Sequence, residues 1–292
     1  MHQLLNDKLK VFLAEPGVEY KGSRFDWCGY IMQVEYEGNT FCTKNSLTKQ
    51  PGREGEGLCN EFGIDMPIGY DVANPGEYFP KIGIGLLKKE DNEPYSFEKH
   101  YEVIPFETEI KLQENNIRYI SRPSEVSGYA FLYQKEISLN ENSFTITYTL
   151  ENTGKKTIQT NEYAHNFISF NHKRIDQDYI LELCGGQSEG ELVEYIDPES
   201  KLRISGNIIA FTGKLQKIIF ISLLSDNNIS GFRLSLETGR LSIAESLSRP
   251  AKKINLWCDV HVISPELYMA LNIEPGEKDS WKRTYTFSKN IF

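Results

Sequence analysis

The chain is short of positive charge. Its 32 Lys and Arg residues are outnumbered by 41 Asp and Glu residues, which gives a net charge of −9. Nucleic-acid binding depends on Lys and Arg to neutralise phosphates, and anionic membranes attract the same residues. The sequence also has no apolar run near the roughly 20 residues that a spanning helix needs. We therefore expect no nucleic-acid partner and no membrane partner.

Paired cysteines are also missing. The five cysteines, at positions 28, 42, 59, 184 and 258, are scattered, with no Cys-x-x-Cys pair and no His/Cys cluster. This pattern argues against a disulfide framework and against a metal site, so we expect reduced thiols. The first residues lack the apolar core and small-residue cleavage site of a secretory signal. Together these features predict a cytoplasmic protein.

Helical periodicity is nearly absent, and only the first dozen residues show a weak helical pattern. By contrast, Phe144, Ile146, Tyr148 and Leu150 alternate with Ser or Thr, a period of two that is typical of strands. Similar runs occur at 129–139, 217–224, 231–236, 240–247 and 268–273, separated by turns such as 226–228 and 274–277. The sequence predicts an all-β protein, a large β-sandwich of about fourteen to sixteen strands.

No linker, repeat or low-complexity segment divides the chain, so we expect a single domain over residues 1–292. Its size and its 39% of hydrophobic residues are sufficient for one large core. The least regular segment runs from Thr43 to Pro80. Its spacing fits either an ordered functional loop or a lid over a ligand.

The segment from Thr160 to Phe167 concentrates polar groups within a predicted strand. It holds Glu162, His165 and Asn166 beside two aromatic residues. Buried polar groups need partners, so such a strand does more than fill a core. Because neighbouring side chains point to opposite faces, Glu162 and His165 face opposite ways unless a bulge intervenes.

Three motifs in order resemble those of the galactose mutarotase-like superfamily, which includes aldose 1-epimerases. They are Gly22-Ser-Arg-Phe-Asp-Trp27 followed by Gly29, the central Asn-Glu-Tyr-Ala-His-Asn-Phe, and Ser264-Pro-Glu266 followed by Pro275-Gly-Glu-Lys-Asp-Ser-Trp281 and Tyr285-Thr-Phe287. The resemblance covers residues 11 to 288. It implies a β-supersandwich with a monosaccharide site on the concave face of one sheet.

The resemblance leaves the position of the acid open. Matching on Thr160-Asn161 places Glu162 where the family has its catalytic histidine, whereas matching on the histidine uses His165. A shift of three residues reverses the strand face, so only one register holds without a bulge. The family's second histidine has no evident counterpart, and His100 is only a loose candidate.

Mutarotation needs a base for the anomeric hydroxyl and an acid for the ring oxygen. We expect the two groups on opposite sides of the bound sugar, each within hydrogen-bond reach, and no cofactor. His165 is the predicted acid, since it shares a strand face with Tyr163 and Phe167, and Glu162 is the alternative acid or a supporting group. Glu266 is the predicted base, because it begins the polar face of the strand 266–273.

Further polar residues are candidates for binding the sugar. Arg24 and Asp26 alternate with Phe25 and Trp27, which predicts a shared strand face. The full set of predicted substrate-binding residues is Arg24, Asp26, Asn60, Glu61, Tyr70, Lys81, Arg122, Asn166 and Asp259. For Arg24 and Asp26 a structural salt bridge is the alternative to a ligand contact.

The sequence therefore predicts an enzyme of aldose 1-epimerase type, which interconverts the anomers of a free aldose. Two alternatives stay open. One is a sugar-binding or sensing protein on the same fold without catalysis. The other is an enzyme for a sugar phosphate or derived sugar, which needs a cationic pocket around Arg24, Lys81 or Arg122.

Overall fold

The computed structural model describes residues 1–48, 52–185, 191–225, 229–238 and 240–289. Within them the chain is almost entirely β-strand, and the only helix is the short 3-10 turn η1 (Phe170–His172). No helix among these residues is long and apolar enough to cross a membrane. The predicted all-β class is confirmed, while the predicted turn at 226–228 lies outside the described residues.

Twenty-three strands are described, more than the fourteen to sixteen expected. In chain order they are β1 (His2–Leu5), β2 (Leu9–Leu13), β3 (Ile31–Tyr36), β4 (Asn39–Thr40), β5 (Leu58–Phe62), β6 (Tyr78–Lys81), β7 (Gly85–Lys88), β8 (Val103–Pro105), β9 (Thr108–Leu112), β10 (Asn116–Ser121), β11 (Phe131–Leu139), β12 (Ser143–Asn152), β13 (Ile158–Asn166), β14 (Tyr179–Cys184), β15 (Glu191–Ile196), β16 (Leu202–Ser205), β17 (Ile208–Phe211), β18 (Ile219–Leu224), β19 (Gly231–Leu236), β20 (Leu241–Leu247), β21 (Lys253–Asp259), β22 (Val262–Ile273) and β23 (Lys278–Lys289).

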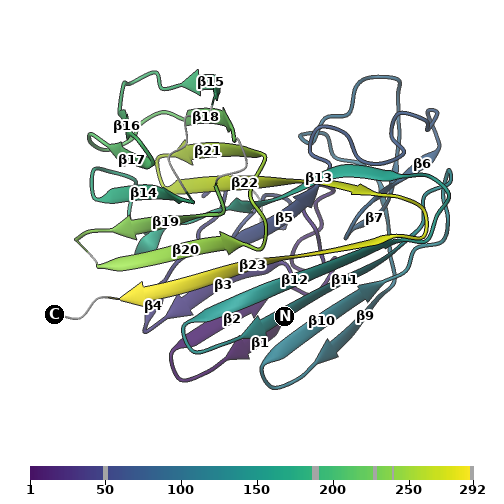
Figure 1. Ribbon diagram of the computed structural model, residues 1–292, viewed down its shortest axis with the longest axis horizontal. Coiled ribbons are helices and arrows are strands. Elements are labelled where there is room, and N and C mark those ends of the chain that lie inside the picture. The colour runs from purple at the N-terminus through teal and green to yellow at the C-terminus, as the bar shows by residue number, and fades with distance from the viewer. Residues whose placement is uncertain (49–51, 186–190, 226–228, 239, 290–292) are drawn as a thin grey trace.

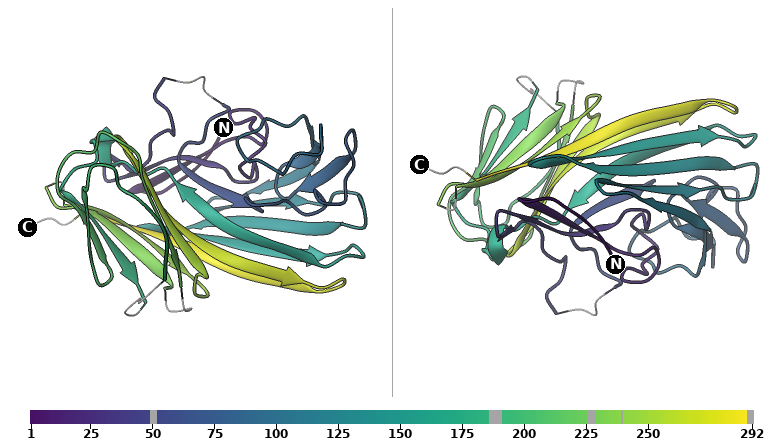
Figure 2. Two further views of the ribbon diagram at one scale, coloured as in Figure 1. Left: turned by 90° about the horizontal axis from the view of Figure 1, so that it is seen from above. Right: turned by 90° about the horizontal axis from the view of Figure 1, so that it is seen from below.

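These strands form two ten-stranded antiparallel sheets and one small sheet (Figure 1). The site sheet, as we call the first, has the order β1-β2-β3-β5-β13-β22-β21-β18-β15, with β4 on β3. The backing sheet has the order β16-β17-β14-β19-β20-β23-β12-β11-β10-β9. The small sheet is β6-β7-β8. Seen from above and below, the N-terminal strands lie to one side of β11, β12 and β23 (Figure 2).

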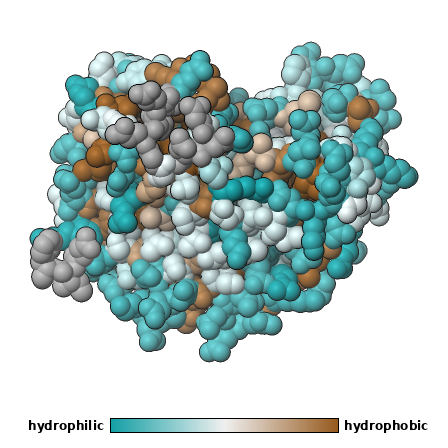
Figure 3. All heavy atoms as spheres, in the orientation of Figure 1, coloured by the Kyte–Doolittle hydropathy of each residue, from teal (hydrophilic) through white to brown (hydrophobic). Residues whose placement is uncertain are grey.

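The main apolar core lies between the two large sheets. Alternation in β12 buries Phe144, Ile146, Tyr148 and Leu150, as the period of two predicted. A smaller apolar cluster covers the outer face of the site sheet and includes Tyr20, Phe25, Tyr101 and Phe167. The surface of the protein carries apolar residues near β15, a strand exposed along its whole length at the edge of the site sheet (Figure 3).

Three local expectations were wrong. The first dozen residues form the hairpin β1–β2 and not a helix, because Leu9, Val11 and Leu13 pack with period two into the core. Residues 23–27 form a loop, so Arg24 and Asp26 share no strand face. Within the irregular segment 43–80, both β5 and the start of β6 are regular strands.

The space between the two large sheets holds buried charged side chains in addition to the apolar core. The guanidinium of Arg283, on β23, contacts Glu162 of β13 at 2.8 Å and also pairs with Glu245 of β20. Lys135 of β11 binds Asp26 at 3.0 Å. All five side chains are almost fully buried. Since a buried charge without a partner is costly, these pairs fix how the sheets sit on each other.

Candidate active site

The candidate site lies on the outer face of the site sheet, where β5, β13 and β22 are neighbours. In the register of β13 with β5, Tyr163 lies opposite Glu61 and His165 opposite Cys59. Side chains at odd positions of β13 point outward, and those of Glu162 and Asn166 point into the space between the sheets. The alternation therefore delivers His165, and not Glu162, to the outer face.

A proline opens the sheet beside His165. The backbone ladder between β13 and β22 runs only from the Ile158–Ile273 pair to the Glu162–Met269 pair. Beyond it stands Pro265, which has no N–H to donate. Side chains take over the pairing: Asn166 Nδ2 donates to the Pro265 carbonyl at 2.7 Å, and the Asn166 N–H donates to Ser264 Oγ at 2.9 Å. These bonds hold Ser264 and Glu266 toward His165.

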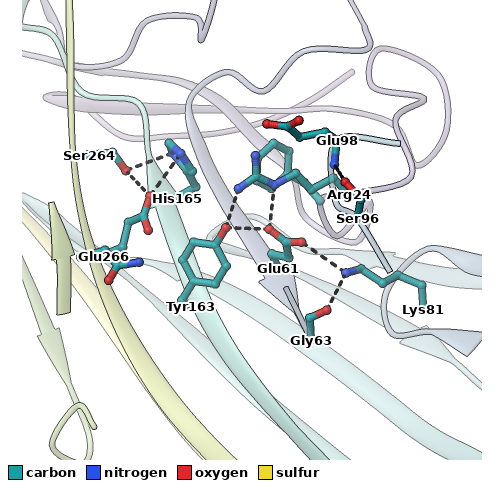
Figure 4. A network of polar contacts seen from close by, with 12 residues as sticks. Arg24, Glu61, Gly63, Lys81, Ser96, Glu98, Tyr163, His165, Ser264 and Glu266 are labelled. Carbon is teal, nitrogen blue, oxygen red and sulfur yellow. Dashed lines mark hydrogen bonds and ion pairs between the residues drawn. The ribbon is translucent and has the colours of Figure 1, made fainter. Parts of the chain in front are cut away.

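His165, Ser264 and Glu266 form a closed triangle of contacts (Figure 4). His165 Nε2 lies 3.2 Å from Glu266 Oε1, and its Nδ1 lies 3.0 Å from Ser264 Oγ. The hydroxyl of Ser264 is also 3.3 Å from Glu266 Oε1. The predicted acid and base are thus brought together. They touch each other, however, and do not stand on opposite sides of a space for a sugar ring, as we had expected.

The surroundings of Glu266 disfavour its negative charge. Burial raises the pKa of this carboxyl to about 7, although Arg24 and a hydrogen bond from Tyr268 work in the opposite direction. The Tyr268 hydroxyl donates to Oε2 at 3.0 Å, and Asn255 Nδ2 donates to that hydroxyl at 3.1 Å. A base with a pKa near neutrality is well matched to proton transfer at neutral pH.

His165 is held neutral. Burial, with a further contribution from the positive charge of Arg24, places the pKa of His165 well below its usual range. Its ring stacks on Phe167 with centroids 4.1 Å apart and meets Phe25 and Trp257 edge-on, at 5.9 and 5.5 Å. Aromatic faces of this kind suit the C–H faces of a pyranose.

A second cluster lies beside this triangle, centred on Arg24 (Figure 4). Its Nε donates to Glu61 Oε2 and its Nη2 to the Tyr163 hydroxyl, both at 2.8 Å. The guanidinium lies over the rings of Phe25 and Phe97, 4.6 and 4.2 Å from their centroids. Arg24 is thereby fixed in one orientation while its side chain stays 22% exposed.

Lys81 joins this cluster through the second carboxyl oxygen of Glu61. Its Nζ lies 3.3 Å from Glu61 Oε1 and also donates to the Gly63 carbonyl and the Tyr95 hydroxyl. Burial opposes ionisation of Glu61, but Arg24 and Lys81 outweigh it and lower the pKa of Glu61. Burial also lowers the pKa of Lys81. The positive charge of Lys81 is therefore paired with Glu61 inside the protein.

A cavity of about 480 Å³ adjoins Arg24. Its walls include Phe25, Asn45, Phe97 and His100. Neither His165 nor Glu266 lines it; Phe25, which contacts the His165 ring, lies between. The cavity therefore adjoins the triangle without including it.

The remaining predicted residues are spread over the fold. Asn60, Asp26 and Asn166 point between the sheets, where they bind Glu162, Lys135 and Glu245. The Tyr70 hydroxyl donates to the Glu93 carbonyl, and Asp259 accepts from the Val260 N–H. Arg122 is exposed just after β10, a strand of the backing sheet. Only Arg24, Glu61 and Lys81 join the cluster beside His165.

Several residues of the site were not singled out from the sequence. Tyr163 and Tyr268 stack at 4.3 Å between the two clusters, and Lys253 lies over the Tyr268 ring at 4.4 Å. Tyr268 stands two residues after Glu266, so the period of two that gives Glu266 a polar face places Tyr268 on the same face and could have identified it. Ser264 stands in the Ser-Pro-Glu motif. The structure shows that its hydroxyl contacts both His165 and Glu266, which the motif alone does not reveal. Among the described residues no group of three or more His, Cys, Asp or Glu side chains could hold a metal ion.

Known structures share this architecture. The chain is similar to a galactose mutarotase-like protein from Lactobacillus casei, with 13% identity, a TM-score of 0.64 and coverage of 99% of this chain and 100% of that one. A galactose mutarotase related enzyme from Lactobacillus acidophilus shows 12% identity, a TM-score of 0.60 and coverage of 99% and 97%. For the GalM/aldose epimerase homologue from C. elegans the values are 12%, 0.53, 99% and 98%.

The sequence itself matches no family model and no curated protein. The likeness to solved structures is thus one of fold, over nearly the whole chain, at identities too low to carry an activity. The predicted β-supersandwich is confirmed, and the protein has the galactose mutarotase-like fold.

Proposed function

We propose that this protein interconverts the α and β anomers of a free aldose by acid–base ring opening. The observation that carries the proposal is the contact between His165 Nε2 and Glu266 Oε1 at 3.2 Å, on a fold shared with aldose epimerase-like proteins. A carboxyl with a pKa of about 7 is a suitable base for this reaction. The neutral imidazole of His165 can donate a ring proton as the acid when its other nitrogen receives one.

Side-by-side placement of the two groups suits the chemistry. The anomeric hydroxyl oxygen and the ring oxygen are both bonded to C1, so a base and an acid that are neighbours can serve both from one edge of the sugar. Glu266 takes the hydroxyl proton, His165 protonates the ring oxygen, and the C1–O5 bond breaks to leave the open aldehyde. Rotation about C1–C2 and the reverse transfers give the other anomer.

The neighbouring residues would bind and orient the sugar. Arg24 offers donors, Glu61 offers an acceptor, and Phe25 and Trp257 offer ring faces. No organic cofactor or metal ion is needed for such proton transfers. We also propose a single domain and a cytoplasmic location, the latter supported by five unpaired cysteines.

The arrangement gives little support to a phosphorylated substrate. Arg24 and Lys81 both pair with Glu61, and Arg122 follows β10 on the backing sheet, so the cations named for an extra anion either neutralise a carboxylate already or lie elsewhere. A binding protein without catalysis would need no carboxyl tuned to a pKa of about 7. Free aldoses are therefore the first substrates to test.

The test is Glu266→Gln, which keeps the size of the side chain and removes its basicity. Exchange between the anomers of D-glucose and D-galactose is followed by polarimetry and by NMR, with a binding titration of the same sugars. We expect exchange to fall by about 10²–10⁴-fold, the usual contribution of a positioned proton transfer, with binding nearly intact. The matched control is Glu182→Gln, an exposed glutamate on β14 of the backing sheet.

Two results would contradict the proposal. Sugar binding by a wild-type protein that does not accelerate exchange would identify a binding protein. Exchange by Glu266→Gln within about threefold of wild type, far below the usual contribution, would show that Glu266 is not the base.

A further inference from the structure

Both nitrogens of the His165 ring reach the same carboxyl oxygen of Glu266. Nε2 reaches Oε1 directly at 3.2 Å, and Nδ1 reaches it through the Ser264 hydroxyl, at 3.0 and 3.3 Å. Ser264 is fully buried, and His165 and Glu266 are 6% and 4% exposed. Protein groups therefore occupy both sides of the imidazole (Figure 4).

The Ser264 hydroxyl has one proton and two acceptors to choose from. Its oxygen already accepts the Asn166 N–H at 2.9 Å, which fixes the position of the hydroxyl. If Ser264 donates to His165 Nδ1, the imidazole carries its proton on Nε2; if it donates to Glu266 Oε1, Nδ1 is free to carry the proton. The direction of one hydroxyl therefore decides the tautomer of the histidine.

The tautomer matters because of how a neutral imidazole acts as an acid. When it gives up its Nε2 proton, it becomes a strongly basic anion unless Nδ1 receives a proton in the same step. The environment of His165 disfavours a positive charge, since the side chain is buried and Arg24 adds its own positive charge nearby. Prior protonation of the ring to imidazolium is the costly route in such a site.

We propose that Ser264 is a proton-relay residue that lets His165 protonate the sugar ring oxygen without becoming charged. The anomeric hydroxyl gives its proton to Glu266 Oε1, Oε1 passes a proton to Ser264 Oγ, Oγ passes its own proton to His165 Nδ1, and Nε2 protonates the ring oxygen as the C1–O5 bond breaks. At the end Glu266 is ionised and Ser264 is neutral, as at the start. The histidine has changed tautomer, and ring closure runs the relay in reverse.

This inference rests on the proposed function and adds a residue that direct transfer between histidine and glutamate does not need. It also accounts for the contact between acid and base, which a pair acting independently does not require. Ser264 touches both partners. Tyr268, whose hydroxyl accepts from Asn255, donates to the other carboxyl oxygen, so Oε1 is the oxygen left to handle protons.

The kinetic test uses Ser264→Ala and Ser264→Thr. The alanine variant has no hydroxyl proton, whereas threonine restores one at the same place. We expect Ser264→Ala to lower kcat by about 10²-fold or more, as the loss of a positioned proton transfer does, with KM little changed. Ser264→Thr should recover most of the rate. Ser242→Ala removes a buried hydroxyl bonded to Ser288 in the backing sheet and controls for loss of a buried hydrogen bond.

The second measurement is independent of activity. Nitrogen-15 NMR of the histidine side chains reports which ring nitrogen of His165 is protonated, with His165→Asn used to assign the signals. We expect one tautomer, protonated on Nε2, in the wild type at pH 8, and a mixed or changed tautomer in Ser264→Ala. If Ser264→Ala loses its rate through poor folding, the kinetic comparison is made with Ser264→Thr.

The outcomes separate the relay from the reaction. If the wild type exchanges anomers and Ser264→Ala does so within about threefold, the relay is overturned and the proposed function stands. A wild-type protein without exchange overturns the function and the catalytic part of the relay. An unchanged His165 tautomer in Ser264→Ala overturns the part of the inference that gives Ser264 control of the ring.

Discussion

Burial removes water from the Glu266 carboxyl, and few hydrogen-bond donors of the protein replace it. It accepts bonds from Tyr268 and Ser264 and lies against His165, whose ring is uncharged. Arg24 stabilises the ionised form from a distance, but Glu61 opposes it and burial dominates. The folded protein therefore binds a proton at Glu266 over a pH range in which the unfolded chain has lost it.

This difference makes a prediction for stability. Between the ordinary pKa of 4.5 and the raised value of about 7, the folded state holds the extra proton, so the stability contributed by Glu266 falls as pH rises through this window. The difference corresponds to at most roughly 3.5 kcal/mol, at about 1.4 kcal/mol per pH unit. Glu266→Gln should then be more stable than the wild type at pH 8 and gain little at pH 4.5. Urea unfolding at both values measures this.

The groups facing Glu266 titrate as well, and the stability contributed by His165 changes within the same window. His165 titrates at lower pH, and its depressed pKa costs stability as pH falls below its ordinary value of 6.5. Tyr268 and Cys258 both have raised pKa values, so they ionise only in strong alkali. A variant that loses the same free energy at both pH values would indicate that the Glu266 carboxyl is not perturbed.

Sequence reasoning reached some residues and not others, for physical reasons. The polar face of the strand 266–273 identified Glu266, since period-two alternation depends only on local geometry. It did not identify Arg24 as a partner of Glu61 and Tyr163, because these lie 37 and 139 residues away in the chain. Ser264 stood in a quoted motif, but its value depends on Pro265 opening the ladder beside β13, which a spacing pattern does not reveal.

Strand β13 separates two kinds of polar chemistry on its two faces. Tyr163, His165 and Phe167 at and just beyond its end point outward, and Glu162 and Asn166 bind charged groups of the backing sheet. The assignment of His165 to an aromatic face was made from parity alone, and no bulge disturbs this strand where it pairs with β5. The prediction of a helix near the N-terminus was wrong because tertiary packing of this segment outweighed its weak helical pattern.

The two faces of β13 make opposite predictions for two variants. His165→Asn should lower anomer exchange by about 10²-fold or more at equal folded fraction, because the ring is the acid on the outer face. Glu162→Gln should lower stability by about 3 kcal/mol, because it leaves the buried Arg283 with only one carboxylate partner. Rates are compared at equal folded fraction, and stability is measured by urea unfolding. If Glu162→Gln abolishes exchange and His165→Asn does not, the acid lies on the other face of the strand.

At the scale of the whole molecule, the two ten-stranded sheets share one apolar core and one buried ionic network. Arg283 of β23 bonds Glu162 of β13 and the Leu267 carbonyl of β22, so one side chain ties the backing sheet to two strands that carry the site. The period of two predicted the sheets, whereas nothing local predicted that their interface would be charged. Such an interface requires the two sheets to form together, which is our reason for proposing one domain.

Arg283→Met tests that coupling. It removes the cation and leaves Glu162 and Glu245 buried beside each other, which should cost about 3–5 kcal/mol. The control is Arg249→Met, whose guanidinium bonds Asp279 at the same 2.8 Å but is 35% exposed, so its loss should cost no more than about 1 kcal/mol. Thermal unfolding followed by circular dichroism and by tryptophan fluorescence should show one coincident transition in all three proteins, shifted as a whole to lower temperature in Arg283→Met. Two separated transitions would mean that the sheets unfold independently, and a shift as small as that of Arg249→Met would mean that the buried network does not hold them together.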